Sequence, residues 1–400
     1  MQADILDPEL YRHGDPHAVY AWLRREAPLY RDAKNDFWVA SRHAEVVHVS
    51  KHPETFCSRH GVVPGSSTKV SMVTMDEPRH GGLRRLVNRG FTPRMVGLLE
   101  PRIRETVKAS LDAVAEKGGC DFVRELAVPL PMIIIAELLG IRREDRDRFE
   151  QWSDTMIAAG GGRAEADPRI AAAAGAAFAQ YAVYLKQVFE DRRRSPREDL
   201  VSILLAAQDE GTLATDEEKL EDDELLMFMT LLLVAGNETT RNAIAGGMIA
   251  LIENPAERAK LVADRSFVPN AVEEVLRWTS PVICFYRTAT RDTELRGERI
   301  REGERVVMIY PSANRDEDVF PDANRFRVDR RPNPHVAFGI GNHFCLGANL
   351  ARLELRIMLD ELVRRLPDIE LAPGTRPTYT DSPFVRGVAS MPVVFTPEER

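Results

Sequence analysis

The most constraining feature of this 400-residue chain is a single cysteine in a glycine-rich segment near the C-terminus. The segment reads FGIGNHFCLGANLAR over residues 338–352 and continues directly into a pattern of helical spacing. Gly339 and Gly341 permit a tight turn and a close approach of the backbone to a flat partner. Gly347 lets the following helix lie near that same partner. A helix N-terminus beside Cys345 favours the thiolate, because backbone N–H groups and the helix dipole stabilise negative charge.

Three other interpretations of this cysteine are open. It is a small buried apolar side chain in many proteins. Cys345 with His343 would make half of a zinc site, but no second Cys/His pair has the usual spacing. Cys345 as a nucleophile would need an oriented base, and nothing marks one. The order Phe-Gly-x-Gly-x-His-x-Cys-x-Gly instead resembles the haem-binding signature of the cytochrome P450 family, where a thiolate is the axial ligand of haem iron.

The bulk composition sets broad limits. A hydrophobic content of 44% is typical of a globular protein, and a net charge of −8 argues against general nucleic-acid binding. Four cysteines, at positions 57, 120, 284 and 345, follow no disulfide framework, which favours a reducing compartment. The N-terminus has no apolar signal core, and the longest apolar run, Leu225 to Gly236, is too short to span a bilayer. We therefore expect a soluble, cytoplasmic protein without a membrane anchor.

Helical periodicity dominates the chain, and strand-like runs are few and short. The spacing predicts helices over Glu100–Glu116, Pro129–Leu139, Ile170–Arg193, Asp222–Glu253 and Asn270–Trp278. It predicts strands over Phe37–Ala40, Arg305–Ile309 and, more weakly, Val393–Phe395, and an ordered irregular segment over Arg315–Pro334. No linker or repeat divides the chain. The fold class is mainly α with a small β portion, and the resemblance implies the helical prism of cytochrome P450 as one domain over residues 1–400.

The long predicted helix contains a local conflict at residues 235–240, AGNETT. Gly, Asn and Thr are poor helix residues, and such conflicts often mark functional sites. A Thr hydroxyl can bond the carbonyl one turn back and open the helix, so that a carboxylate and a hydroxyl share one groove. The alternative is a kinked core helix with a solvated glutamate. The segment resembles the P450 oxygen-activation motif, which implies that Glu238 is the acid and Thr239 the alcohol of a proton relay.

Glu274 and Arg277 stand three residues apart on one predicted helix face, where side chains meet. Such a pair is commonly a solvated surface pair. It also resembles the buried Glu-x-x-Arg pair of the P450 family, which implies a structural brace for the irregular segment. The third partner should come from residues 325–335, and Arg330 is our choice, with Arg325 and His335 left open.

Haem carries two propionates, so a buried haem site must supply cations, and arginine binds carboxylates with two parallel hydrogen bonds. The resemblance implies four such contacts, although each residue alone would usually be a surface cation: His80, Arg84, Arg287 and His343. It also implies an apolar pocket whose walls include a loop near Val62–Val73 and the residues Leu232, Ala235, Val282, Ile283, Phe285, Phe384 and Val385. Taken one by one, these are equally compatible with ordinary core. The Ala- and Gly-rich segment Ala158–Ala179 is where a mobile lid would lie.

The resemblance implies a haem-thiolate monooxygenase with haem b as its cofactor. No Gly-x-Gly-x-x-Gly fingerprint for a flavin or NAD follows a strand, so electrons would come from separate partners, a ferredoxin and its ferredoxin reductase. The runs over residues 280–297, 312–317 and 330–339 resemble bacterial members that oxidise steroid side chains and branched lipids. Three alternatives remain open: a tailoring hydroxylase of natural-product biosynthesis, a peroxide-driven peroxygenase and a catalytically silent haem protein. The pair Glu238–Thr239 argues against the last two.

Overall fold

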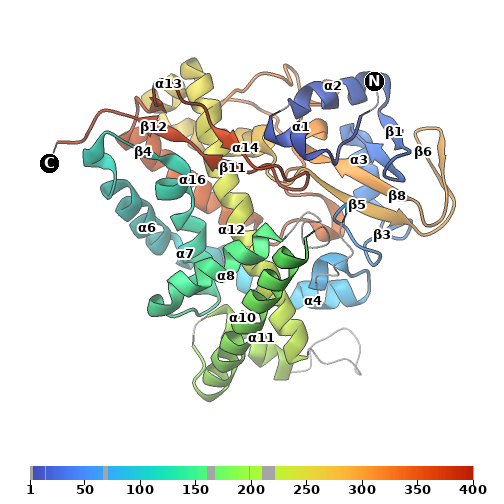
Figure 1. Ribbon diagram of the computed structural model, residues 1–400, viewed down its shortest axis with the longest axis horizontal. Helices are drawn as coiled ribbons and strands as arrows, with labels where there is room; N and C mark the ends of the chain where they lie inside the picture. Colours follow the sequence, from blue (N-terminus) through green and yellow to red (C-terminus); the bar gives the residue numbers. More distant parts are fainter. Residues whose placement is uncertain are drawn as a thin grey trace.

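The computed structural model describes residues 3–13, 15–65, 71–159, 167–197, 199–209 and 221–399 (Figure 1). Its helices are α1 (Pro8–Arg12), α2 (Pro16–Glu26), α3 (His43–Lys51), α4 (Arg79–Asn88), α5 (Pro93–Leu98), α6 (Glu100–Asp112), α7 (Pro129–Leu138), α8 (Arg146–Ala158), α10 (Pro168–Arg194), α11 (Leu200–Asp209), α12 (Asp222–Glu253), α13 (Pro255–Ala263), α14 (Val268–Thr279), α15 (Tyr310–Ala313) and α16 (Ala348–Arg365). Short 3-10 segments and one π-helical segment, Val123–Ala127, connect them.

The strands are short: β1 (Leu29–Asp32), β2 (Phe37–Ala40), β3 (Phe56–Cys57), β4 (Gly119–Asp121), β5 (Cys284–Ala289), β6 (Thr293–Leu295), β7 (Glu298–Ile300), β8 (Arg305–Ile309), β9 (Glu370–Leu371), β10 (Thr378–Tyr379), β11 (Val388–Ser390) and β12 (Pro392–Val394). The largest sheet has the order β1-β2-β8-β5-β3. Within it β2 and β8 pair in parallel, and β5 pairs antiparallel with β8. The mainly α fold with a small β portion is therefore confirmed.

The predicted helices are all present, four of the five with shifted ends. α12 matches its predicted range, whereas α6 ends at Asp112, four residues before the predicted end. Pro255 ends α12 and also begins α13, because proline is favoured in the first turn of a helix. The N-terminus of α12 is fixed by a capping box in which the Glu221 and Glu224 side chains each accept from the other residue's backbone.

α12 passes through the middle of the molecule, with α6 and α7 on one side and the five-stranded sheet on the other (Figure 1). It packs directly on α7, α14 and α16. Its buried residues contribute to two hydrophobic clusters, one shared with α6, α14 and α16 and one shared with α7, α8 and α10. The middle of this helix is thus packed against elements of both clusters. Within the described ranges, no helix is both long and apolar enough to span a membrane.

Candidate active site

The cysteine loop, residues 338–347, is a compact turn that its own backbone holds. The Cys345 amide donates a hydrogen bond of 2.8 Å to the Phe338 carbonyl. Gly339 and Gly341 have φ angles of 68° and 79°, which L side chains rarely adopt. The tight turn that the sequence predicts is therefore present, and it lies between the irregular segment before it and α16 after it.

A large cavity lies beside the cysteine loop. It encloses about 1600 Å³ that protein atoms do not fill, part of it open to solvent, and Gly339, Cys345 and Gly347 line it. A Cβ atom at Gly347 would meet no protein atom within 4 Å, and one at Gly339 would meet only the His343 carbonyl oxygen at 3.7 Å. The loop thus presents bare backbone to the cavity, which leaves room for a flat group to approach.

The protein by itself does not favour a thiolate at Cys345. Burial raises the pKa of this thiol, and a hydrogen bond from the Gly347 backbone and the charges of Arg84 and Arg352 offset only part of the rise. The prediction that the helix N-terminus would favour the thiolate is therefore wrong for the protein alone, because loss of hydration outweighs the helix dipole. A bound metal ion deprotonates a coordinating thiol outright, so iron bound at Cys345 would hold this side chain as the thiolate.

The four predicted cations converge on the same cavity. His80, Arg84, Arg287 and His343 all line it, from α4, β5 and the cysteine loop. His80 and Arg287 are buried. Among the described residues, no ion pair satisfies Arg84 or Arg287, so two guanidinium groups face this space without a carboxylate.

The electrostatics of this cluster favour a bound anion. The rings of His80 and His343 stack at 4.0 Å, and His80 Nε2 is buried without a hydrogen-bond partner. Burial, together with the charges of Arg287, His80 and Arg84, lowers the pKa of His343 to about 2. Burial likewise lowers the pKa of Arg84 and of Arg287. A dianion in the cavity would relieve this mutual repulsion.

α12 stays helical through the AGNETT segment. The Thr239 hydroxyl donates to the Ala235 carbonyl at 2.8 Å, one turn back as expected, and Thr239 lines the cavity. Glu238 does not line it, and its carboxylate lies 3.8 Å from the Arg241 guanidinium. The acid and the alcohol therefore point to different sides of the helix, and the single groove expected for both is absent. Gly236 also lines the cavity, and a Cβ there would lie 3.0 Å from Ile135 on α7.

The predicted pocket residues divide into two groups. Leu232, Ala235, Val282 and Phe285 line the cavity, whereas Ile283, Phe384 and Val385 do not, which corrects the prediction for these three. Ile283 packs instead in the hydrophobic cluster that includes Tyr11 of α1 and Tyr20 and Leu23 of α2. Val385 pairs with Val282 through its backbone, and the Phe384 ring packs 5.4 Å from the Phe285 ring. Val385 and Phe384 thus contact the cavity-lining residues Val282 and Phe285 without lining the cavity themselves.

Two other predicted segments extend beyond the described residues. In the loop Val62–Val73, Val73 lines the cavity, but residues 66–70 lie outside the described part of the chain. In the predicted lid Ala158–Ala179, residues 160–166 lie outside it, and the rest belong mainly to α8 and α10.

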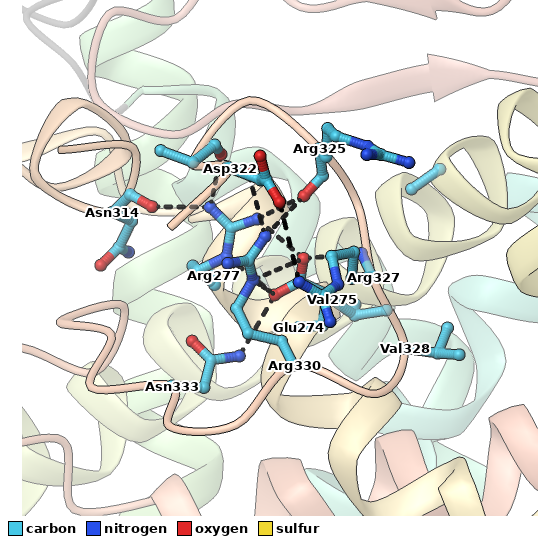
Figure 2. A network of polar contacts seen from close by, with 12 residues as sticks. Glu274, Val275, Arg277, Asn314, Asp322, Arg325, Arg327, Val328, Arg330 and Asn333 are labelled. Carbon is cyan, nitrogen blue, oxygen red and sulfur yellow. Dashed lines mark hydrogen bonds and ion pairs between the residues drawn. The ribbon is translucent and has the colours of Figure 1, made fainter. Parts of the chain in front are cut away.

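A buried ion network holds the irregular segment that precedes the cysteine loop (Figure 2). The carboxylate of Glu274 accepts two hydrogen bonds from Arg277, of 2.7 and 2.8 Å, and both side chains are fully buried. Arg277 also donates to the backbone carbonyls of Asn314 and Ala323 at 2.8 and 2.9 Å. The backbone amide of Arg327 donates to Glu274 at 2.8 Å. This network joins α14 to backbone that lies 37 to 53 residues further along the chain.

Arg330 is the candidate third partner that contacts Glu274, with a guanidinium–carboxylate distance of 3.0 Å (Figure 2). Arg325 takes part through its backbone carbonyl, which accepts from Arg277 and from Arg330 at 3.1 and 2.8 Å. His335 lies elsewhere, 3.0 Å from Glu273. These contacts satisfy the buried charges and fix the backbone that leads to the cysteine loop.

The model of the cytochrome P450 family matches residues 167–393. The chain belongs to the cytochrome P450 family. It is a P450 monooxygenase, and its cofactor is haem.

Curated relatives of this P450 span almost its whole length. A steroid C26-monooxygenase of Mycolicibacterium smegmatis is 40% identical, over 98% of this chain and 96% of the relative. A methyl-branched lipid omega-hydroxylase of Mycobacterium bovis is 38% identical, over 94% of this chain and 90% of the relative. Among solved structures, a cytochrome P450 from Chondromyces apiculatus has a TM-score of 0.87 at 39% identity, over 100% of this chain and 99% of that one.

The residues around the cavity fit haem. The bare backbone at Gly339 and Gly347 suits a flat ring, and Cys345 offers one sulfur ligand. Among the described residues, the guanidinium groups of Arg84 and Arg287 on the cavity wall form no ion pair. The orphaned Nε2 of His80 suits a propionate oxygen. Each of these properties belongs to the protein, and together they match the shape, the axial ligand and the charge of this cofactor.

Sequence reasoning missed several residues of the cavity. Phe228 and Leu231 of α12 precede Leu232 and Ala235 on the same helix face, so helical periodicity could have found them. Glu354 of α16 also lines the cavity and is 2% exposed. Its only sequence signal is a lone acid among the apolar residues of the pattern LARLELRIML.

Proposed function

We propose that this P450 hydroxylates a hydrophobic substrate of the steroid, branched-lipid or terpenoid-like class. The observation that carries the proposal is the apolar wall that α12 and the segment after α14 build above the cysteine loop. It consists of Phe228, Leu231, Leu232, Ala235, Val282 and Phe285, and none of these residues carries a charge or a hydrogen-bonding side chain. The names of the mycobacterial relatives, a steroid C26-monooxygenase and a methyl-branched lipid omega-hydroxylase, support the same class.

The roles of the chain's residues follow from their surroundings. When bound, haem supplies oxygen activation, and its thiolate ligand favours cleavage of the O–O bond. Cys345 would be that ligand, and the cation cluster would hold the propionates. The Thr239 hydroxyl donates its hydrogen bond to the Ala235 carbonyl, so its lone pairs can accept a hydrogen bond from a water in the cavity. Glu238, whose side chain is 16% exposed, can exchange protons with solvent on the other side of α12.

We also propose that electrons arrive from a ferredoxin and its reductase, and that residues 1–400 act as one domain. The candidate docking cations are Arg85 of α4, Arg89 directly after that helix, and Arg352 and Arg356 of α16, which follows the cysteine loop. Arg352 pairs with Glu273 at 2.7 Å, and Arg356 pairs with Glu100 at 3.2 Å. An acidic partner would therefore compete with these carboxylates, and its binding should weaken as salt rises.

The test is a titration of the ferric holoenzyme, in separate experiments, with a steroid, a methyl-branched fatty acid and a polyketide-like macrocycle. Binding is monitored by the position of the haem absorption band. The steroid or the branched lipid should displace water and shift the band, and turnover with ferredoxin, reductase and NADH should give a hydroxylated product. Shifts with the macrocycle alone would favour the tailoring hydroxylase. Product with hydrogen peroxide but none with the electron partners would favour the peroxygenase.

A matched pair of variants tests the wall itself. Phe285→Ala removes a ring that lines the cavity, and it should weaken substrate binding about ten- to hundredfold, since burying an aromatic ring contributes about 1.5–3 kcal/mol. Phe384→Ala removes the neighbouring ring that does not line the cavity. Its effect on the dissociation constant should be smaller. Equal effects of the two variants would argue against the proposed substrate wall.

A further inference from the structure

A second group of cations without matching carboxylates lies outside the haem cavity. It consists of His17 in the first turn of α2, Arg315 just after α15, and Arg386 two residues before β11. None of these three residues, the His17 cluster, lines the haem cavity. Within the described ranges, none of them forms an ion pair. The elements that carry them are in contact: α2 packs on α15, and α1 packs on β10, the strand that precedes Arg386.

The side chains of the His17 cluster lie close to one another. The Arg386 guanidinium donates a hydrogen bond to the carbonyl oxygen of Tyr11. The Tyr11 hydroxyl lies 3.3 Å from that of Tyr20, whose ring packs edge-on at 5.7 Å from the His17 ring. Burial, followed by charges that include those of Arg315 and Arg386, lowers the pKa of His17 well below its usual value. Both arginines therefore act on the same imidazole.

The protein leaves polar atoms of this cluster unsatisfied. Arg315 is 9% exposed, and its Nε atom is buried without a hydrogen-bond partner. Its guanidinium carbon lies 3.7 Å from the centre of the Trp278 ring, which covers one face of the group, whereas the N–H bonds point outward in the guanidinium plane. The Nδ1 atom of His17 is likewise buried without a partner. Burial, with the charges of Arg277 and Arg24, lowers the pKa of Arg315 to about 9. A buried donor without an acceptor costs free energy, so a further acceptor would stabilise this region.

The carboxylates near the cluster have other partners or lie too far away for an ion pair. Glu317 binds Arg24 at 2.9 Å. The side chain of Asp15 is the N-cap of α2 and accepts a hydrogen bond of 3.0 Å from the backbone of the first turn. Glu253 ends α12, and its pKa is raised by burial, which the charge of Arg315 offsets only in part. Within the described part of the chain, none of these carboxylates pairs with the His17 cluster, so positive charge is in excess there.

We propose that the His17 cluster binds an oxyanion, a phosphate or a carboxylate group, at a site separate from the haem cavity. The planar guanidinium fork binds two oxygen atoms at once, which favours an oxyanion over a spherical halide ion. The imidazole of His17 can supply a further donor. Arg386 is partly exposed and Asp15 is exposed, so the anion can enter from solvent. The site joins α2, the turn after α15 and the segment before β11, and it does not depend on the proposed hydroxylation.

The first test is a calorimetric titration of the holoenzyme with inorganic phosphate at constant ionic strength. Haem in the holoenzyme fills the cavity with its own propionates, so phosphate should report on the His17 cluster. The wild type should bind one phosphate per chain. Arg386→Gln should weaken binding at least about tenfold, because it removes charged hydrogen-bond donors. Arg25→Gln makes the same charge change at an exposed residue of α2, and this matched control should leave the dissociation constant unchanged.

The second test separates binding from folding. Arg386→Gln also loses the hydrogen bond to the Tyr11 carbonyl, so each variant is compared by the change in its own Tm when phosphate is added. Phosphate should raise Tm of the wild type and of Arg25→Gln by more than that of Arg386→Gln. That difference excludes the general stabilising effect of phosphate on proteins. Arg315→Lys keeps the positive charge but loses the guanidinium fork, and it should also weaken phosphate binding.

Titrations with acetate and with glycerol phosphate identify the bound group. Tighter binding of acetate than of phosphate would assign a carboxylate, and equal binding of glycerol phosphate and phosphate would assign a phosphate group carried by a larger molecule. Tighter binding of free phosphate than of both would assign the inorganic ion. The proposal is overturned if the wild type binds neither phosphate nor acetate, or if Arg386→Gln binds phosphate as tightly as the wild type. Displacement of phosphate by an equal concentration of chloride would also overturn it, because the site would then not select an oxyanion.

Discussion

Gly341→Ala should lower the free energy of unfolding for two reasons that are visible in the structure. Gly341 has a φ of 79°, and a left-handed conformation costs an L residue about 1–2 kcal/mol. Its Cβ would also lie 2.5 Å from the carbonyl oxygen of Ser50, on the last turn of α3. That oxygen belongs to the backbone, so rotation of a side chain cannot relieve the contact. Overpacking of this kind adds about 1–3 kcal/mol.

The two effects sum to about 2–5 kcal/mol, a large part of the about 5–15 kcal/mol that stabilises a typical domain. The strain also acts four residues before Cys345, so displacement of the loop should reduce haem content. Gly374→Ala is the matched control, because Gly374 has a φ of 75° and a Cβ there would meet no atom within 4 Å. Gly374→Ala should therefore lower the free energy of unfolding only by the cost of the left-handed backbone, about 1–2 kcal/mol.

The assay is urea unfolding of the three holoenzymes, with haem content measured by absorption after purification. We expect Gly341→Ala to unfold at clearly lower urea than Gly374→Ala and to retain less haem. Equal midpoints and equal haem content in the two variants would refute the reasoning, because they would show that the contact between the cysteine loop and α3 is not tight.

Three further predictions concern ligation, the buried brace and the relay. Cys345→His should lose the red-shifted carbon monoxide band of thiolate ligation, and a normal thiolate spectrum would show that another residue binds the iron. Arg277→Ala should cost about 3–5 kcal/mol and reduce haem retention, because Glu274 loses a fully buried partner, whereas wild-type haem content and Tm would contradict this. Thr239→Ala should keep substrate binding and NADH use but divert electrons to peroxide, and Glu238→Gln should slow O₂ consumption. Full coupling of product to NADH in Thr239→Ala would remove this hydroxyl from the relay.

The parts of the site that depend on local pattern could be predicted from the sequence. The turn around Gly339 and Gly341 and the position of α12 follow from glycine placement and apolar period, and the structure has both. The direction of Glu238 also follows from helix geometry, because neighbours on a helix point about 100° apart. The expected opening of the helix would have overcome that separation, but α12 stays regular, and Glu238 pairs with Arg241 instead.

The parts that depend on tertiary contact could not be predicted in this way. Val282 and Ile283 are adjacent apolar residues, and only the pairing of this segment with Val385 decides which of them faces the cavity. Arg330 and His335 lie within six positions of each other, and the path of the irregular segment decides that Arg330 contacts Glu274. The state of Cys345 depends on burial, and no local motif reports how completely water is excluded.

The contrast between Arg277 and Arg287 shows what the structure adds. Both arginines are buried, at 0% and 6% exposure, and the sequence alone does not distinguish their environments. Arg277 donates to a carboxylate and to three backbone carbonyls, so the protein already satisfies it. Arg287 donates only to its neighbour's carbonyl among the described residues, and it faces the cavity with Arg84. The first network is complete without a ligand, whereas the second is completed by an anion. Binding of haem should therefore stabilise the cavity end of the protein, by linkage, far more than the Glu274 brace.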